Sequence, residues 1–198
     1  MSKILVTGFD PFGGETVNPA WETVKLLPDC IEGNEVLKLE IPTVFGKGAG
    51  KVISKIEEEK PAFVFLIGQA GGRSAVTPET TAYNRMDARI PDNEGNEPKE
   101  MRIIQDAPET LHVNVPVAET VDGMKKDGYN IEVSDNAGRF VCNELLYRVI
   151  DHLSGTKVKY DFVHVPFLPS QAKEGVASME LEEIKDTLLE YIRRTVRE

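Results

Sequence analysis

Short apolar runs alternate with segments of helical periodicity through the first third of the chain. The apolar runs are residues 3–7, 36–42 and 62–68, and helical patterns cover residues 19–27 and 48–59. This alternation predicts β-α-β units, in which short buried strands pair in parallel. We therefore expect an α/β fold built on a largely parallel sheet.

The second half of the chain repeats the alternation less regularly. Strand-like residues 111–115, 130–134 and 162–166 are separated by helical patterns over residues 117–126 and 141–153. A last helix is the clearest, because five apolar side chains recur on one face: Leu181, Ile184, Leu188, Tyr191 and Ile192. The chain has 198 residues and 40% hydrophobic content. We expect a single domain that spans residues 1–198.

Residues 69–108 interrupt this rhythm with a long stretch that is dense in Gly, Pro, Asp, Asn and Arg. Long irregular segments in a compact domain are usually functional or disordered. This segment follows the predicted strand at residues 62–68, and open α/β sheets bind ligands at the carboxyl ends of their strands. We expect the ligand side of the sheet to be here.

The charge of the chain argues against two classes of partner. The formal net charge is −10, whereas nucleic acids and anionic membrane surfaces require clustered Lys and Arg. No apolar run approaches the roughly 20 residues of a transmembrane helix. Two cysteines form no disulfide framework, and the apolar segment after the Met-Ser-Lys start is too short for a signal peptide. We expect a cytoplasmic protein.

Cys142 is the most informative single residue. Turn-forming residues 134–138 precede it, and the helical pattern of residues 141–153 begins beside it. Free N–H groups and the positive dipole end at a helix start favour an anion, so we expect a lowered pKa and a nucleophilic thiol. The alternative is a small core residue, and a nearby base is needed to decide between the two.

Of the three histidines, His164 is the best candidate for that base. It lies where a predicted strand runs into a proline-bounded loop, the position where α/β sheets carry catalytic groups. His112 lies in a strand-like segment, and His152 is about 15 Å along the helix from Cys142 at 1.5 Å per residue. A histidine between valines is also a common core residue, so the position alone does not establish a base.

A third group should orient the imidazole, as a carboxylate does in Ser/His/Asp arrangements. Five acids follow the strand at residues 62–68, and spacing does not choose among them: Glu79, Asp87, Asp92, Glu94 and Glu97. The acidic run that starts at Asp92 has its glycine too early for a calcium-binding EF-hand loop, so we expect no metal site.

Two glycine-rich turns resemble nucleotide-binding loops but do not fit them. Residues 8–14 depart from the G-x-G-x-x-G pattern, and residues 46–52 lack both the first glycine and the metal-binding hydroxyl of a P-loop. Phe9 and Phe12 in the first turn are better suited to the wall of a small apolar pocket, or to the core beneath the turn.

Five motifs then occur in order along nearly the whole chain: GFDPFGG at residues 8–14 followed by Asn18 and Pro19, GQAGGR at 68–73, DARIPDNEG at 87–95, AGRFVCN at 137–143 and HVPFLP at 164–169. Together they resemble the pyroglutamyl peptidase I family, also called pyrrolidone carboxyl peptidases. The resemblance implies a three-layer α/β/α sandwich around a mixed, largely parallel twisted sheet. It also implies a homotetrameric cysteine peptidase that removes N-terminal pyroglutamate from peptides and needs no metal or organic cofactor.

The resemblance also assigns residues. It implies Cys142 as nucleophile, His164 as base and Glu79 as the acid that orients the base. One departure is visible, because Thr80 stands where the family usually has arginine. The resemblance further implies a pocket for the pyroglutamyl ring, with polar contacts from Asn18 and Gln69, an arginine near the thiol, and apolar walls: Phe9, Phe12, Asn18, Thr43, Gln69, Arg89, Ile90, Phe140 and Val141.

Two other classes of function suit the same architecture. A nucleoside-phosphorylase-like α/β enzyme would need an arginine and a backbone phosphate site, which we do not find in the sequence. A non-catalytic protein that binds small ligands would keep the pocket and use Cys142 only for packing. Release of an amine from a pyroglutamyl amide distinguishes both from a peptidase.

Overall fold

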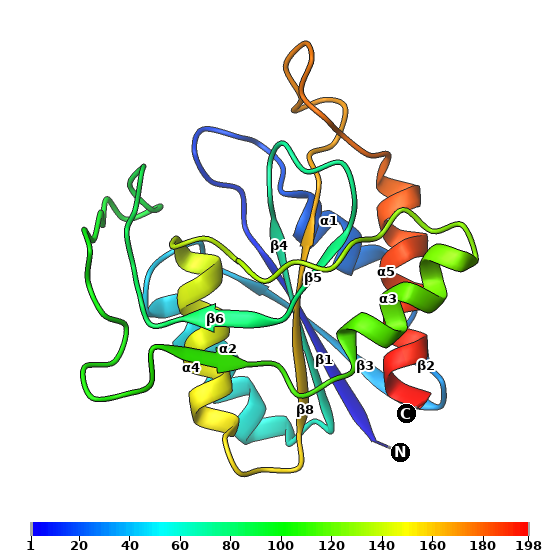
Figure 1. The fold of residues 1–198 in the computed structure, drawn as a ribbon, viewed down its shortest axis with the longest axis horizontal. Coiled ribbons are helices and arrows are strands. Elements are labelled where there is room, and N and C mark those ends of the chain that lie inside the picture. The colour runs from blue at the N-terminus through cyan, green and yellow to red at the C-terminus, as the bar shows by residue number, and fades with distance from the viewer. Residues whose placement is uncertain (1, 198) are drawn as a thin grey trace.

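The computed structural model describes residues 2–197. Its elements follow in the order β1 (Lys3–Phe9), α1 (Pro19–Leu26), β2 (Cys30–Ile31), β3 (Asn34–Ile41), α2 (Lys47–Glu59), β4 (Phe63–Gln69), β5 (Thr77–Glu79), β6 (Thr81–Tyr83), β7 (Thr110–His112), α3 (Val117–Lys126), α4 (Val141–Leu153), β8 (Lys159–Val165) and α5 (Leu181–Arg197) (Figure 1). The predicted alternation of the first third is confirmed within a few residues at each boundary.

Six strands form the central sheet in the order β2-β3-β1-β4-β8-β5. The four inner strands β3, β1, β4 and β8 are parallel, whereas β2 and β5 pair antiparallel at the two edges. Strands β6 and β7 form a separate antiparallel pair. The expectation of a mixed, largely parallel sheet is therefore confirmed.

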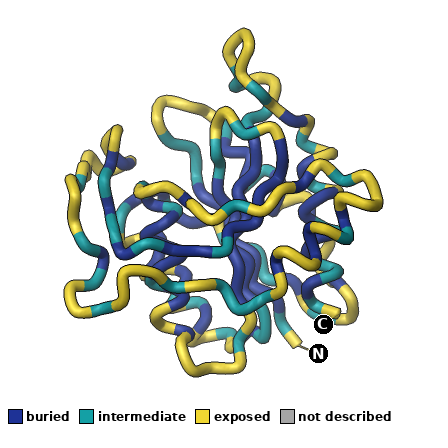
Figure 2. The backbone as a smooth tube through the Cα atoms, viewed as in Figure 1, coloured by how far each residue is buried: buried dark blue, intermediate teal, exposed yellow. Residues whose placement is uncertain are grey.

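Helices cover both faces of the sheet. In Figure 1, α2 and α4 lie on one side of the strands, and α1, α3 and α5 lie on the other. Because both faces are covered, β1, β4 and β8 are buried along almost their whole length, as Figure 2 shows. Burial of these apolar side chains is the main favourable contribution to folding.

The structure differs from the sequence prediction around residues 69–134. The irregular segment contains the three-residue strands β5 and β6, which the sequence did not indicate. The predicted strand at residues 130–134 forms only isolated bridges, Ile131 with Val76 and Ser134 with Glu79. These segments are too short for a hydrophobic period to develop, and their partners are fixed by the edge of the sheet.

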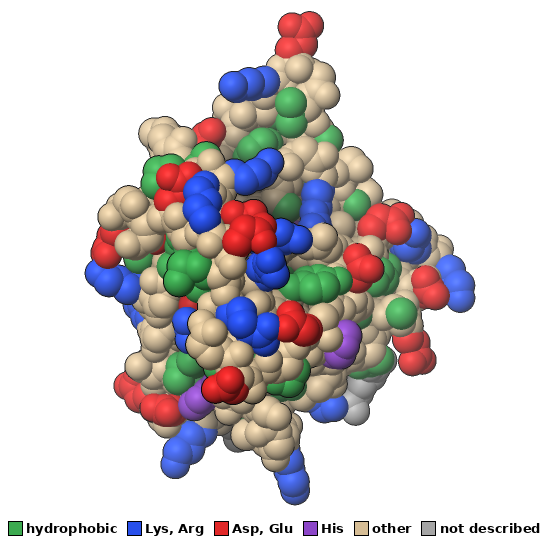
Figure 3. Space-filling view, turned by 60° about the vertical axis from the view of Figure 1, so that its left-hand side comes forward, with side chains coloured by type: hydrophobic (Ala, Val, Ile, Leu, Met, Phe, Trp, Pro, Cys, Tyr) green, Lys and Arg blue, Asp and Glu red, His purple; other side chains and the backbone are tan. Residues whose placement is uncertain are grey.

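The surface carries charges of both signs. On the face drawn in Figure 3, acidic and basic side chains are interspersed. Among the helices of residues 2–197, none is both long enough and apolar enough to cross a membrane.

Candidate active site

The antiparallel pairing of β5 with β8 brings Glu79 to His164. The His164 Nδ1 atom lies 2.7 Å from the Glu79 Oε1 atom, and the two side chains are buried. The Phe162 ring packs edge-on against the imidazole, with 4.7 Å between ring centroids. Of the five acids that spacing left open, Glu79 is the one whose carboxylate contacts His164 in the described chain.

Cys142, on helix α4, lies at the same site as the Glu79–His164 pair. It is the second residue of α4, and its Sγ atom lies 2.9 Å from the position that a Cβ atom on Gly68 would occupy. Gly68 on β4 is the register partner of His164 on β8. The missing side chain of Gly68 therefore makes room for the thiol beside the histidine. Cys142 and His164 line one cavity of about 950 Å³.

Asn143 holds the start of α4 in place. Its Oδ1 atom accepts a hydrogen bond from the Tyr83 N–H at 2.8 Å, and its Nδ2 atom donates to the carbonyl oxygens of Tyr83 at 2.8 Å and Arg85 at 2.9 Å. The residue next to the thiol is thus bonded to the end of β6 and to the chain just after it. These three bonds hold the start of α4, and with it the thiol, in place, and sequence reasoning assigned Asn143 no role beyond its place in a motif.

Arg73 is a second contact of Glu79 that sequence reasoning missed. Its Nη1 atom donates to Glu79 Oε1 at 2.7 Å and also to the Thr77 hydroxyl, and its Nη2 atom donates to the Asn136 carbonyl at 3.0 Å. Arg73 stands within one of the five motifs, yet nothing in the spacing links it to Glu79. The turn after β4 brings it back toward β5.

The two buried partners shift each other's protonation. Burial by itself raises the pKa of the Glu79 carboxyl, but the hydrogen bond and charge of His164 and the charge of Arg73 outweigh it, so the pKa lies below its usual value. Burial lowers the pKa of His164 further than Glu79 raises it, and Arg73 also lowers it. The favoured state at neutral pH is an ionised Glu79 beside a neutral imidazole.

The thiol departs from the sequence expectation. Burial raises the pKa of Cys142 to about 12, and the nearby Glu79 charge raises it too, while Arg73 and the Cys142 backbone N–H lower it. The expectation of a lowered pKa is therefore wrong. Loss of hydration at the half-buried sulfur outweighs the helix start, because the thiolate loses part of its water shell there.

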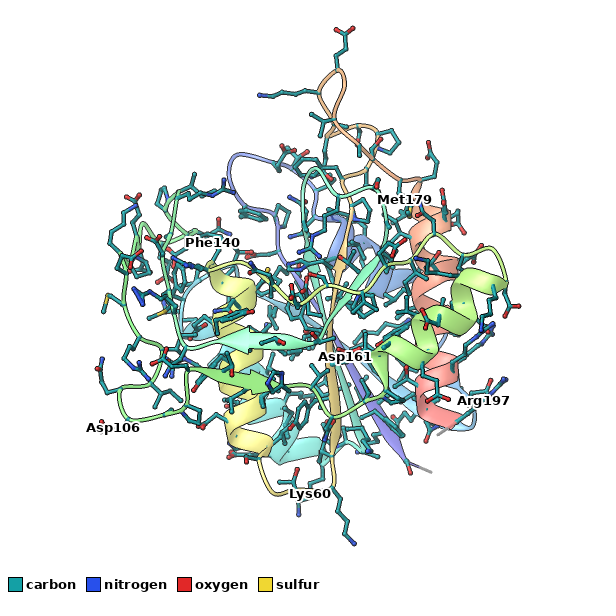
Figure 4. The ribbon with its side chains drawn as sticks, in the orientation of Figure 1. Lys60, Asp106, Phe140, Asp161, Met179 and Arg197 are labelled. Carbon is teal, nitrogen blue, oxygen red and sulfur yellow. The ribbon has the colours of Figure 1, made fainter. Side chains whose placement is uncertain are left out.

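All nine predicted pocket residues line the cavity that contains the thiol: Phe9, Phe12, Asn18, Thr43, Gln69, Arg89, Ile90, Phe140 and Val141. Phe140 caps the start of α4, where Figure 4 labels it, and its ring centroid lies 6.0 Å from that of Phe12 and 5.3 Å from that of Phe45. Phe9 is also a core residue, with 2% exposure. Phe9 therefore belongs both to the wall of the cavity and to the hydrophobic core.

Two polar residues considered from the sequence, Asn18 in the cavity wall and Asp92 in the loop after Ile90, have local structural roles. Asn18 caps α1 by accepting from the Ala20 N–H at 3.0 Å, and it donates to the Asp10 carbonyl at 2.9 Å. Asp92 accepts hydrogen bonds from the backbone N–H groups of Phe45 and Asn96, each at 2.9 Å. Asp92 therefore organises its own loop, which explains why an acid in that position is not the partner of His164.

The other two histidines contact different groups. The His112 Nδ1 atom lies 3.2 Å from the Thr81 hydroxyl. His152, in the last turn of α4, lies 3.8 Å from a carboxylate oxygen of Glu57.

Comparison with known proteins places these features in one family. A sequence profile described as pyroglutamyl peptidase matches residues 2–198. A pyrrolidone-carboxylate peptidase of Finegoldia magna is 46% identical over 199 residues, which cover 98% of this chain and 93% of that protein. One from Enterococcus faecalis is 44% identical over 200 residues, with the same two coverages of 98% and 93%.

Solved structures agree with the sequence relationship. The crystal structure of pyroglutamyl peptidase I from Bacillus amyloliquefaciens has a TM-score of 0.94 and 39% identity, covering 100% of this chain and 98% of that one. The pyrrolidone carboxyl peptidase of Thermococcus litoralis has a TM-score of 0.94 and 30% identity, with coverages of 100% and 94%. Sequence and fold agree along nearly the whole length, and the resemblance seen in the five motifs is confirmed: the chain belongs to the pyroglutamyl peptidase family.

Proposed function

We propose that the chain removes N-terminal pyroglutamate from peptides, with Cys142 as nucleophile, His164 as base and Glu79 as the residue that orients the base. The observation that carries this proposal is the Glu79–His164 contact of 2.7 Å behind a cavity that the Cys142 thiol lines. The family relationship favours a peptidase over the phosphorylase-like and non-catalytic alternatives.

The protonation states define the first step. The ionised Glu79 carboxylate accepts a hydrogen bond from the Nδ1–H group of His164, so the ring proton stays on Nδ1 and Nε2 is unprotonated and able to act as a base. Because the resting thiol keeps its proton, we expect His164 to take that proton as the sulfur attacks the carbonyl, rather than to act on a preformed thiolate. Glu79 then stabilises the imidazolium.

The remaining steps balance without a metal or organic cofactor. Sulfur bonds to the carbonyl carbon between pyroglutamate and the next residue, and the carbonyl oxygen becomes an oxyanion. The Cys142 backbone N–H, in the first turn of α4, is a donor without a partner inside the helix and can bond this oxyanion. The C–N bond breaks as His164 protonates the leaving amine. Water, deprotonated by His164, hydrolyses the thioester and frees pyroglutamate and the thiol.

The nine pocket residues suit the substrate ring. Pyroglutamate is a neutral lactam without a free α-amine, so aromatic walls and a few hydrogen bonds recognise it better than charged anchors do. A glutaminyl amide would carry a charged amine into the same, largely apolar cavity, and removing that charge from water is costly. We expect glutaminyl amides to be poor substrates.

The direct test is release of a chromogenic amine from a pyroglutamyl amide, compared with the prolyl and glutamyl amides. We expect strong preference for the pyroglutamyl substrate. Equal rates for all three amides, or no release from any of them, would contradict the proposed function.

The nucleophile is tested with the two cysteines as a matched pair. Cys142→Ser should fold and lose almost all turnover, because a serine paired with the same base is a much weaker nucleophile. Cys30→Ser, on an exposed residue, should leave turnover nearly unchanged. Equal losses in the two variants, with folding intact, would remove Cys142 from this role.

The homotetramer stays a prediction from the resemblance, and the cytoplasmic location stays a prediction from the cysteine content and the start of the sequence. Light scattering after size exclusion measures the oligomeric state directly.

Thr80, where the family usually has arginine, is half-buried, and its N–H group donates a hydrogen bond to the Ser134 carbonyl at 2.7 Å.

A further inference from the structure

The loop that follows β8 brings a glutamine behind the cavity. Residues 168–178 leave the carboxyl end of β8 and project beyond the body of the fold, beside the loops that follow β1 and β4 (Figure 1). Within this loop, Gln171 is half-buried. Its side chain touches three groups: the Leu168 N–H, the Val17 carbonyl and the side chain of Gln69. Gln69 lines the cavity.

Two backbone groups fix which way the Gln171 amide faces. The Leu168 N–H can only donate, and it lies 3.2 Å from Gln171 Oε1. The Val17 carbonyl can only accept, and it lies 3.3 Å from Gln171 Nε2. Exchanging the two ends of the amide would oppose donor to donor and acceptor to acceptor. The orientation of Gln171 is therefore determined by groups of unambiguous polarity.

The orientation of the Gln171 amide determines the orientation of the Gln69 amide. Gln171 Nε2, already identified as a donor, lies 3.1 Å from Gln69, so the Gln69 atom that faces it must be the acceptor Oε1. The Gln69 Nε2 atom, with two N–H groups, is then at the other end of the amide. The amide of an unconstrained glutamine side chain rotates readily by 180°, because its last torsion angle, χ3, has a broad, two-fold preference. Gln171 removes that freedom.

We infer that Gln171 is a positioning residue that fixes the Gln69 amide with its N–H groups toward the cavity, where they donate to the lactam carbonyl of the substrate. The inference rests on the proposed function. A lactam offers one carbonyl acceptor that a proline ring lacks, so the direction of this one amide contributes to the choice between the two rings. Gln171 acts through Gln69 and is not among the residues that line the cavity.

The test uses Gln171→Glu. A carboxylate still accepts from the Leu168 N–H but has no proton to give, so it repels Gln69 Oε1 and favours the reversed amide. The reversed Gln69 presents an acceptor to an acceptor. We expect the affinity for 2-pyrrolidinone, the bare lactam, to fall about 10- to 100-fold, with a similar fall in kcat/KM carried mainly by KM. NMR titration measures the affinity independently of turnover.

Three further variants test whether the effect of Gln171→Glu comes from its bond to Gln69. Gln105→Glu makes the same chemical change on an exposed residue and should have no effect. Gln171→Met removes the donor without adding a charge and should give a smaller loss, which keeps the test valid if the glutamate variant folds poorly. In a Gln69→Leu background, Gln171→Glu should cause no further loss.

The outcomes separate this inference from the proposed function. Wild-type affinity for 2-pyrrolidinone in both Gln171 variants, absence of 2-pyrrolidinone binding in the wild type, or an undiminished effect in the Gln69→Leu background would overturn the inference while leaving amine release intact. If the wild type binds 2-pyrrolidinone in a Gln171-dependent way but releases no amine from a pyroglutamyl amide, the positioning role holds and the proposed function is wrong.

Discussion

Two carboxyl groups on the two sides of the sheet are both fully buried, yet they are in opposite protonation states. Glu79 faces His164 and Arg73, and its pKa is lowered. Asp161 lies part-way along β8, as Figure 4 shows, and burial raises its pKa to about 8. Its side chain accepts hydrogen bonds from the Tyr191 hydroxyl and from the Phe162 N–H.

The difference shows that the partners, not the depth of burial, decide the charge. Asp161 and His164 are three residues apart on one strand and so point to opposite faces, toward α5 and toward the cavity respectively. Neutral donors such as Tyr191 offset only part of the cost of removing a carboxylate from water, whereas the cationic Arg73 and a protonatable imidazole offset more. One strand therefore carries a neutral acid on one face and supports an ionised one on the other.

The largest expected contrast is in activity. Glu79→Gln should lower kcat roughly 10³- to 10⁴-fold, because the imidazole loses both its orientation and its counter-charge. Asp161→Asn, the same isosteric change on the other face, should leave kcat within about threefold. Steady-state kinetics with a pyroglutamyl amide, together with the Tm of each variant, checks both. A large kcat loss in the Asp161 variant at normal Tm would show that the two faces are not independent.

The second contrast is in how the stability of the folded protein depends on pH. The folded pKa of Asp161 is above its unfolded value, so its contribution to stability is fully present below pH 4 and is lost as pH rises through about 8. The loss should amount to a few kcal/mol, on the order of 1.4 kcal/mol for each tenfold change in the dissociation constant. Asp161→Asn should remove this dependence and be more stable than the wild type at pH 9. Urea unfolding at pH 5, 7 and 9 measures it, and parallel curves for both proteins would contradict the assignment.

A third contrast concerns the space at the thiol. A Cβ atom on Gly68 would lie 2.9 Å from Cys142 Sγ and 2.7 Å from the Phe162 ring, so Gly68→Ala must displace the thiol or the ring beside His164. We expect kcat to fall about 10- to 100-fold, since misplacement by 1 Å can cost about 10²-fold. Gly50→Ala, in α2 with no atom within 4 Å of the added carbon, should keep full activity. Equal activity of both variants would mean that Gly68 does not determine the thiol position.

The smallest effect is a shift in the pH profile. Arg73 lowers the pKa of His164, so Arg73→Gln should move the acid limb of kcat/KM to higher pH. Arg197→Gln, which removes a surface ion pair with Glu32, is the control and should leave the profile in place. A shift in the opposite direction would show that Arg73 acts on His164 mainly by orienting Glu79.

The sequence predicted the inner strands and most helices because each carries its own hydrophobic period. It could not choose Glu79 from spacing, because the contact with His164 joins residues 85 positions apart through the edge strand β5, which has only three residues. The family motifs supplied that choice. Arg73 and Gln171 were missed for the same reason: turns bring each of them to its partner. The thiol pKa was mispredicted because desolvation depends on how the cavity closes, which local sequence does not encode.

Because the resting Cys142 thiol keeps its proton, we expect it to resist oxidation. Peroxides and other oxidants attack the thiolate, and the early products of that attack lead on to irreversible acids. With a pKa of about 12, almost none of the resting Cys142 is in the vulnerable form at neutral pH. We expect the resting enzyme to lose activity only slowly in dilute hydrogen peroxide.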